Sequence, residues 1–242
     1  KPPVAKILAN DDGFGWSIES YLQQIQAQGG CQFDHIIVPL YLTQQTTPQM
    51  IEQGAQSGLL QACKYYPPHG TTNSEYGCSI DQLVKNKVLA AMEAHDVVLC
   101  IHGEQHDLPA EHYFARHSNA EEAFYRDIMP RLRDRYPKLR MVCEHLTTQV
   151  AVEFVQKSDQ NIAATVTPQH LLYTIGDLLQ GLKYHLYCLP LLKFEQDRQA
   201  LRQAVISPNN QQFFAGTDSA PHTTKMTQCG CSAGCYTAPI GP

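Results

Sequence analysis

The strongest constraint on the fold is a regular alternation of short apolar runs with segments of helical periodicity along nearly the whole chain. The apolar runs are five to eight residues long and nearly continuous. Such runs are typical of parallel strands that are covered on both faces. The predicted strands are His35–Leu42, Gln61–Tyr66, Val97–His102, Leu139–His145, Ile162–Thr167, His185–Leu189 and Gln212–Thr217.

The segments between these runs place apolar residues at helical spacing. The clearest is Asn119–Arg135, which opens with a capping Asn119, has Glu121 and Glu122 in its first turn, and is followed by Pro137. Two further helices are predicted between Leu42 and Gln61 and after Thr167. The remaining predicted helices are Trp16–Gln28, Asp81–His95, Thr148–Lys157 and Phe194–Ile206.

Length and composition predict one globular domain over residues 1–242, since 43% of the residues are hydrophobic and 17% are charged. The net charge of −5, without a basic block, argues against a nucleic-acid partner. Apolar stretches such as Val97–Ile101 are far shorter than the ~18–20 residues of a membrane span. Single cysteines within apolar runs indicate buried free thiols in a reducing, cytoplasmic compartment: Cys63, Cys100, Cys143 and Cys188.

Strands that alternate with helices, without a break in composition, predict an α/β fold. A doubly wound sheet is one arrangement, but a (β/α)₈ TIM barrel fits better because such barrels take ~250 residues. Seven predicted strands leave that barrel one strand short. The missing strand 1 is expected before the helix at Trp16, and the closing helix after the last strand is missing too.

Polar residues stand at the carboxyl ends of four predicted strands, each directly after an apolar run, and a barrel forms its active site at that end. They are Lys64, His102, His145 and Asp218. Any one of them alone is more simply a salt-bridged or hydrogen-bonded side chain, but four that converge on one rim predict a divalent metal site. Imidazole and carboxylate favour zinc. The Lys64 ammonium would repel a metal ion, so it must lose its charge or be chemically converted.

Seven local motifs around these residues occur together and in one order. They are Lys64-Tyr65-Tyr66-Pro67, Thr71-Thr72-Asn73-Ser74, His102-Gly103-Glu104, Glu144-His145-Leu146-Thr147-Thr148, Thr167-Pro168-Gln169-His170, His185-Leu186-Tyr187-Cys188-Leu189-Pro190 and Gly216-Thr217-Asp218-Ser219-Ala220-Pro221-His222. This series resembles the class II (bacterial and fungal type) dihydroorotases of the amidohydrolase superfamily. The resemblance covers the chain closely from Gln61 onward, and the first sixty residues only in the order of elements.

The resemblance implies a binuclear zinc centre and a reaction. Lys64 matches the family lysine that becomes N6-carboxylysine and bridges two zinc ions, while His102 and His145 match the ligands of the second zinc. Asp218 matches the catalytic aspartate that binds the first zinc and shuttles the proton. The reaction so implied is the reversible cyclisation of N-carbamoyl-L-aspartate to dihydroorotate in pyrimidine biosynthesis, performed by a homodimer.

The same resemblance implies the substrate contacts. Thr71 and Thr72 fall on the family's mobile loop, whose Pro67, Pro68 and Gly70 suit a hinge. The substrate's carboxylate and ring amide would meet His222 and the backbone around Leu189, Ala220, Ala233 and Gly234. The cysteines of Cys229–Cys235 lack a fourth ligand at zinc-site spacing, so this segment is interpreted as part of the substrate loop.

One departure from the family keeps alternatives open. The family's first strand carries a His-x-His pair for the first zinc, and none occurs here; Lys1-Pro2-Pro3-Val4 resembles the segment that follows that strand. One hypothesis is an incomplete record of an active dihydroorotase. Another is a degenerate, inactive structural subunit with at most one zinc, whose open barrel a different partner covers. A third is a module that binds the small-molecule substrate without turnover. The complete set of Lys64, His102, His145 and Asp218 favours the first.

Overall fold

The computed structural model describes residue 6, residues 17–71 and residues 74–219. Five predicted substrate residues lie outside the described residues, as does the cysteine segment 229–235: Thr72, Ala220, His222, Ala233 and Gly234. The chain divides into two compact units. The first comprises Lys1–His102 with Arg133–Met141, and the second comprises Gly103–Leu132 with Val142–Pro242.

Six strands are hydrogen-bonded in the order β1-β2-β3-β4-β5-β6, which is also their order in the chain. The β1–β2, β2–β3 and β5–β6 pairs are parallel. A strand order without reversal is that of a (β/α)₈ barrel, whereas a doubly wound sheet reverses its order at a switch point. The strands are β1 (Leu40–Tyr41), β2 (Ala62–Tyr65), β3 (Val98–Ile101), β4 (Met141–Cys143), β5 (Ile162–Val166) and β6 (Phe213–Ala215).

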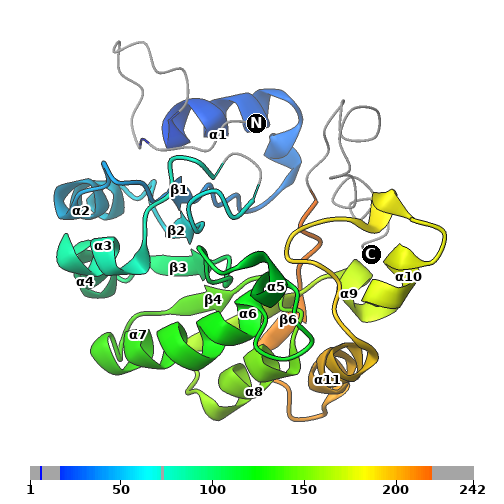
Figure 1. Ribbon diagram of the computed structural model, residues 1–242. Helices are drawn as coiled ribbons and strands as arrows, with labels where there is room; N and C mark the ends of the chain where they lie inside the picture. The colour runs from blue at the N-terminus through cyan, green and yellow to red at the C-terminus, as the bar shows by residue number, and fades with distance from the viewer. Residues whose placement is uncertain (1–5, 7–16, 72–73, 220–242) are drawn as a thin grey trace. The chain divides into compact units, whose positions relative to one another are not determined.

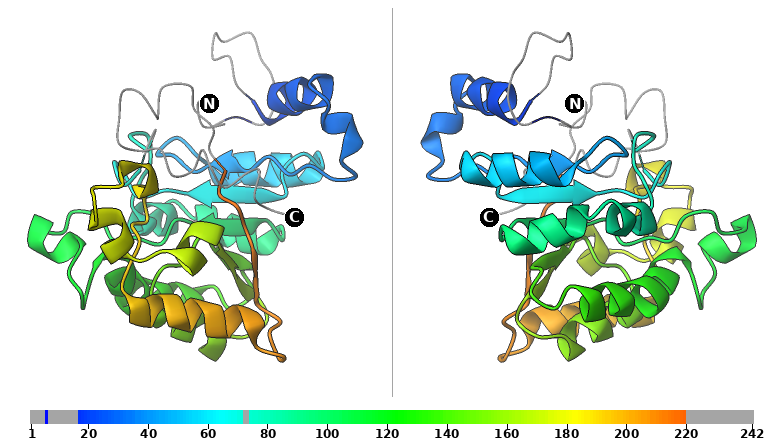
Figure 2. Two further views of the ribbon diagram at one scale, coloured as in Figure 1. Left: turned by 90° about the vertical axis from the view of Figure 1, so that its right-hand side faces the viewer. Right: turned by 90° about the vertical axis from the view of Figure 1, so that its left-hand side faces the viewer.

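In the first unit, parallel pairing aligns Lys64 on β2 with Cys100 on β3. The Leu99 N–H donates to the Arg140 carbonyl at 2.9 Å, which places the start of β4 beside β3. Helices α2 and α4 pack on each other beside these strands (Figures 1 and 2). The helices of this unit are α1 (Ile18–Ala27), α2 (Pro48–Gln56), α3 (Ile80–Lys85) and α4 (Val88–Ala94), with the 3₁₀ turn η1 (Gly30–Gln32).

The helix predicted over Asp81–His95 is divided into α3 and α4. The Lys87 backbone lies between them in the left-handed region, at φ 60°. Its predicted apolar face is nevertheless buried, with Leu83, Leu89 and Met92 at most 1% exposed. The periodicity therefore identifies the buried face, although it does not reveal the break.

In the second unit, helices α8 and α11 pack against each other, with α8 against β5 and α11 against β6 (Figures 1 and 2). Ser and Thr caps begin most of the long helices of the chain; here the Thr148 hydroxyl accepts from the Ala151 N–H at 3.2 Å. The helices from residue 103 onward are α5 (Ala110–Tyr113), α6 (Ala120–Ala123), α7 (Met129–Arg135), α8 (Gln149–Lys157), α9 (Pro168–Leu172), α10 (Ile175–Leu179) and α11 (Glu195–Ile206), with the 3₁₀ turn η3 (Tyr184–Leu186).

The helix predicted over Asn119–Arg135 is present, but its middle is the π-helical turn η2 (Phe124–Ile128). The Met129 N–H donates to the Phe124 carbonyl, five residues back. Pro130 follows this bond; proline has no N–H, and its ring disfavours the carbonyl four residues earlier. The π turn lets the helix continue past the proline.

The strand predicted over His185–Leu189 is wrong. This segment contains η3 and irregular backbone instead of a strand. Its Leu186 belongs to a small buried cluster with Leu178 of α10, Leu191 and Leu192, and its Tyr187 and Leu189 are partly buried against this cluster. Burial against a helix thus accounts for the apolar run, and Pro190 could not donate to a strand ladder. The strand predicted over His35–Leu42 is shortened to β1, and the other five are confirmed.

Two further predictions concern cysteines and membranes. Cys63, Cys100, Cys143 and Cys188 form no disulfide among the described residues; Cys63 and Cys143 are fully buried, as predicted, whereas Cys100 and Cys188 are only half-buried. Burial raises the pKa of the Cys143 thiol to about 12, so this thiol stays protonated. Within the described ranges, no helix combines the length and the apolar character that crossing a bilayer requires.

Candidate functional site

In the first unit, Lys64 and His102 occupy the carboxyl ends of neighbouring strands. Lys64 is the third residue of β2, and His102 comes directly after β3. The His102 N–H donates to the Tyr65 carbonyl at 3.1 Å, so the parallel pairing fixes its backbone. The His102 side chain is 1% exposed, and Lys64 is half-buried.

An aromatic ring joins these two predicted ligands. The Lys64 Nζ lies 4.8 Å from the Tyr66 ring centroid, and the His102 ring centroid lies 6.1 Å from the same ring. The Tyr41 ring packs edge-on against Tyr66 at 5.5 Å. The ammonium over the ring face and the edge-on Tyr41–Tyr66 pair are both favourable contacts. The first unit therefore brings Lys64 and His102 together on Tyr66.

In the second unit, the backbone after β4 turns sharply at His145, which has φ 44° and is 4% exposed. The His145 N–H donates to Thr165 Oγ1 at 2.7 Å, and the Leu146 N–H donates to the Thr165 carbonyl at 3.1 Å. Thr165 lies on β5, so the neighbouring strand holds the turn. A residue other than glycine seldom adopts a positive φ, and such positions are enriched at functional sites.

Asp218 follows β6 and also has a positive φ, of 47°, with an exposed side chain. The Gly216 N–H donates to the Val166 carbonyl at 3.0 Å. A Cβ at Gly216 would lie 2.8 Å from the Thr165 Cβ, so only glycine fits. Thr165 thus contacts both the turn that carries His145 and the segment that leads to Asp218.

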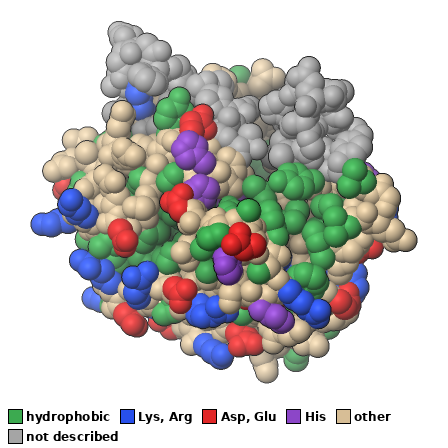
Figure 3. All heavy atoms as spheres, in the orientation of Figure 1, with side chains coloured by type: hydrophobic (Ala, Val, Ile, Leu, Met, Phe, Trp, Pro, Cys, Tyr) green, Lys and Arg blue, Asp and Glu red, His purple; other side chains and the backbone are tan. Residues whose placement is uncertain are grey.

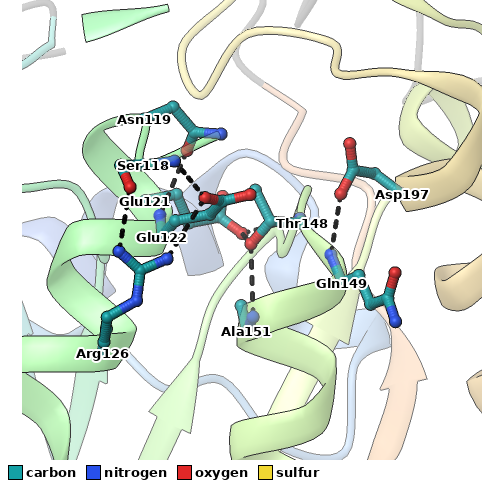
Figure 4. A network of polar contacts seen from close by, with 9 residues as sticks. All are labelled: Ser118, Asn119, Glu121, Glu122, Arg126, Thr148, Gln149, Ala151 and Asp197. Carbon is teal, nitrogen blue, oxygen red and sulfur yellow. Dashed lines mark hydrogen bonds and ion pairs between the residues drawn. The ribbon is translucent and has the colours of Figure 1, made fainter. Parts of the chain in front are cut away.

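A buried carboxylate fixes the residues after His145. Glu121 of α6 accepts from the Thr147 N–H at 2.8 Å and the Thr148 N–H at 2.9 Å, and from both threonine hydroxyls. Figure 4 shows Glu121 directed at Thr148, the cap of α8. Burial raises the pKa of the Glu121 carboxyl, while Lys193 and these hydrogen bonds oppose the rise.

Glu121 and Thr165 are functional residues that the sequence analysis missed. Asn119-Ala120-Glu121-Glu122 is a pattern typical of a helix start, and it explains the presence of Glu122 but not of Glu121. The Glu122 N–H donates to Asn119 Oδ1 at 3.1 Å, and the Glu122 carboxylate accepts from the Ser118 N–H. The sequence contained one signal of the buried contact: a second acid, Glu121, that the helix start does not require, and the adjacent pair Thr147-Thr148.

His170 ends one of the seven motifs, and at a strand end it suits either of two roles, a positioning residue near a metal ligand or a core histidine. It lies on α9 and is buried, with Nε2 3.0 Å from the Pro190 carbonyl and Nδ1 2.6 Å from Thr167 Oγ1. A carbonyl only accepts, so Nε2 carries the proton and Nδ1 accepts from the Thr167 hydroxyl. Both ring nitrogens are engaged within the protein, which favours the core interpretation. Burial lowers the pKa of His170 to about 4.

Two of the predicted substrate residues are described. The Thr71 N–H donates to Ser74 Oγ at 2.9 Å, and Ser74 Oγ donates back to the Thr71 carbonyl at 2.7 Å. Leu189 is half-buried against the leucine cluster of α10. The contacts of Thr71 and Leu189 do not test a role in substrate binding, so that role stays a prediction.

The predicted metal ligands divide between the units, with Lys64 and His102 in the first and His145 and Asp218 in the second. Within the part of the chain that the structure describes, no three His, Cys, Asp or Glu side chains gather around a common point for a metal ion. The ligand set as a whole remains a prediction.

Comparisons with known proteins extend over most of the chain, although no family model matches it. A dihydroorotase of Halorhodospira halophila is 48% identical over 207 residues, which are 84% of this chain and 58% of that protein. One of Idiomarina loihiensis is 42% identical over 244 residues, which are 98% of this chain and 66% of that protein. The crystal structure of Saccharomyces cerevisiae dihydroorotase in complex with 5-fluoroorotic acid superposes with a TM-score of 0.76 at 27% identity, over 96% of this chain and 63% of that one.

The chain spans less than two thirds of the length of these relatives. Its parallel strands in sequential order agree with the barrel of the same superfamily. The identity along nearly the whole chain and the superposition both lead to the same group of proteins. The chain belongs to the dihydroorotase family of the amidohydrolase superfamily.

Proposed function

We propose that the protein to which this chain belongs is a dihydroorotase, which interconverts N-carbamoyl-L-aspartate and dihydroorotate in pyrimidine biosynthesis. The observation that carries the proposal is 48% identity to a dihydroorotase over a stretch of 207 residues. Lys64, His102, His145 and Asp218 stand in one order at the ends of β2, β3, β4 and β6. The 5-fluoroorotic acid in the yeast relative supports a ring-shaped, carboxylated ligand.

By the family resemblance, Lys64 as N6-carboxylysine, His102, His145 and Asp218 would hold two zinc ions together with the family's His-x-His pair, which this sequence does not contain. The donor chemistry fits, because imidazole and carboxylate oxygens are zinc ligands, and carboxylation turns the lysine from a cation into an anionic donor. When bound, zinc lowers the pKa of water to near neutrality and polarises a carbonyl.

In the hydrolytic direction, Asp218 would accept the proton of the attacking water and deliver it to the ring nitrogen as the C–N bond breaks. In the cyclising direction the same carboxyl would take the proton of the carbamoyl nitrogen and return it to the oxygen that leaves as water. Asp218 is exposed, as a proton shuttle must be in order to reach both positions. Thr165 and Glu121 would keep His145 and its loop in place during the reaction.

The substrate would be bound by the residues that match the family's contacts. Its carboxylate and ring amide would meet His222 and the backbone at Leu189, Ala220, Ala233 and Gly234, with Thr71 and Thr72 closing over them. The protein would act as a homodimer in the cytoplasm. The alternative, a degenerate structural subunit covered by a different partner, is favoured by no observation on the described residues.

The test uses the natural full-length protein with dihydroorotate and N-carbamoyl-L-aspartate as substrates. Asp218→Asn should lower the rate in both directions at least about 100-fold, the usual size of a general acid–base contribution. Asp96→Asn is the matched control, since Asp96 is another exposed aspartate with a positive φ but precedes β3. Full activity of Asp218→Asn, or no turnover by the wild type, contradicts the proposal.

Intact-mass measurement and metal analysis test the zinc part separately. Two zinc ions per chain of the natural protein are expected, together with the extra mass of a carboxylated Lys64 under non-denaturing conditions. A protein with at most one zinc and no turnover would be the structural subunit instead.

A further inference from the structure

The second unit contains a pocket of about 270 Å³ that none of the predicted metal or substrate residues lines. Its walls come from four residues between 116 and 126, the first two turns of α8 and the start of α11. Figure 3 shows charged side chains of both signs gathered over α6, α8 and α11. Pockets for drug-sized ligands measure about 300–1,000 Å³, so this one suits a small metabolite.

The carboxylates of this pocket are already matched by donors of the protein. Glu122 accepts from the Ser118 N–H and pairs with Arg126 at 3.4 Å. Asp197 accepts from the Gln149 N–H at 2.9 Å, a contact drawn in Figure 4, and from the Phe194 N–H at 3.2 Å. Glu153 pairs with Lys157 at 3.1 Å. None of these acids therefore needs a cation from outside.

Arg116 differs from these groups. Its guanidinium lies over the Phe194 ring, with Cζ 5.2 Å from the centroid. Among the described residues, no hydrogen bond or ion pair joins this guanidinium to the protein. Stacking on a ring uses the face of a guanidinium and leaves its edge, a fork of N–H donors, for a carboxylate or phosphate.

Polar groups beside Arg116 complete the pocket. His117 is its exposed neighbour. The N–H of Val150, in the first turn of α8, has no hydrogen-bond acceptor among the described residues. Gln196 donates its amide to Gln149 Oε1 at 2.6 Å, which leaves the Gln196 oxygen as an acceptor. The pocket thus offers donors for an anionic group and an acceptor for a second polar group.

We propose that this pocket binds a small molecule with one carboxylate or phosphate group, held edge-on by Arg116. The anionic group would receive hydrogen bonds from the guanidinium and from the Val150 N–H. A hydrogen-bond donor elsewhere on the ligand would face the Gln196 oxygen. This site is independent of the dihydroorotase reaction proposed above.

The test follows the arginine side-chain N–H signals of the ¹⁵N-arginine-labelled, full-length protein by NMR. Inorganic phosphate and malonate are titrated separately at constant ionic strength, which distinguishes the two kinds of anion. The Arg116 signal, assigned by its loss in Arg116→Gln, should shift saturably with a Kd on the order of 1 mM. In Arg116→Lys, calorimetric binding should be about tenfold weaker, because lysine keeps the charge but loses the fork.

Arg135 is the matched control. It is exposed and also lies over an aromatic ring, with Cζ 5.9 Å from the Tyr136 centroid, but it lines no part of this pocket. Its signal should not move, and Arg135→Gln should bind both anions as the wild type does. The proposal is overturned if Arg116 and Arg135 respond alike, if neither responds, or if Arg116→Lys binds with unchanged affinity.

Discussion

In the second unit, the turn that carries His145 is held by hydrogen bonds. The Thr165 hydroxyl oxygen accepts from the His145 N–H at 2.7 Å. The buried Glu121 carboxyl group accepts from the N–H and hydroxyl groups of Thr147 and Thr148. In the first unit, Lys64 and His102 meet on the ring of Tyr66 instead. The second unit thus fixes the turn of His145 with a buried carboxyl group and hydrogen bonds, whereas the first places Lys64 and His102 on an aromatic surface.

The difference determines which substitutions each unit tolerates. Buried donors around a carboxylate become unsatisfied when the acceptor is replaced, even by a group of the same size. An aromatic contact depends on shape and on the electron-rich ring face, so it survives the loss of a hydroxyl. Conservative polar changes should therefore damage the second unit most, and only a change of shape should damage the first.

The largest effect is expected at Glu121. Glu121→Gln keeps the volume but turns an amide NH₂ toward donors, which should lower the free energy of unfolding by about 3–4 kcal/mol. Urea unfolding at neutral pH measures this change. Glu121→Gln should also lower the affinity of the protein for zinc, since the residues after His145 lose the hydrogen bonds that hold them.

Glu122→Gln is the control on the same helix. The Glu122 carboxylate accepts from Ser118 and Arg126, and its side chain is 9% exposed. Water can replace part of these contacts, so about 1 kcal/mol is expected. If Glu121→Gln and Glu122→Gln lower the free energy of unfolding equally, the buried contacts of Glu121 with Thr147 and Thr148 have no special role.

The second prediction concerns His170, another part of the hydrogen-bonded unit. Burial lowers its pKa from 6.5 to about 4, with Lys193 adding to the shift and the Pro190 carbonyl and Glu104 opposing it. Between these values the unfolded chain binds a proton that the folded chain does not, so stability is lost as pH falls from 6.5 toward 4. The loss over this window should be about 3 kcal/mol at most, and no more is lost at this residue below pH 4.

Urea unfolding at pH 7, 6, 5 and 4 tests this window. His170→Gln should be less stable at pH 7 but should have a flatter profile between pH 6.5 and 4. His112→Gln replaces an exposed histidine and should keep the wild-type profile. If His170→Gln follows the wild-type slope, the buried imidazole is not the source of the acid sensitivity.

The barrel order and most strands could be predicted from local pattern, because a buried parallel strand is a continuous apolar run. The strand predicted over His185–Leu189 is wrong for a physical reason: the four apolar residues of Leu186–Leu189 also suit a loop that packs against a helix. The break at Lys87 and the π turn before Pro130 change hydrogen bonding without changing which face is apolar, so periodicity does not detect them.

The site could be predicted only where a residue's place in the chain determines its place in the fold. Lys64 lies at the carboxyl end of β2, while His102, His145 and Asp218 lie within three residues after β3, β4 and β6, and strand ends are visible in the sequence. Glu121 lies 26 residues from Thr147, and Thr165 lies 20 residues from His145. Contacts of that separation depend on how helices and strands pack, and no local pattern contains that information.

The smallest effect is expected at Tyr66, where the first unit can be tested against the second. Tyr66→Leu removes the ring that Lys64, His102 and Tyr41 share, and should lower the free energy of unfolding by about 1–2 kcal/mol. Tyr66→Phe keeps the ring and should cost less than about 0.5 kcal/mol. Urea unfolding of both variants gives the comparison. If Tyr66→Phe is as damaging as Tyr66→Leu, then the hydroxyl matters and the first unit also depends on hydrogen bonds. The contrast between the two units then disappears.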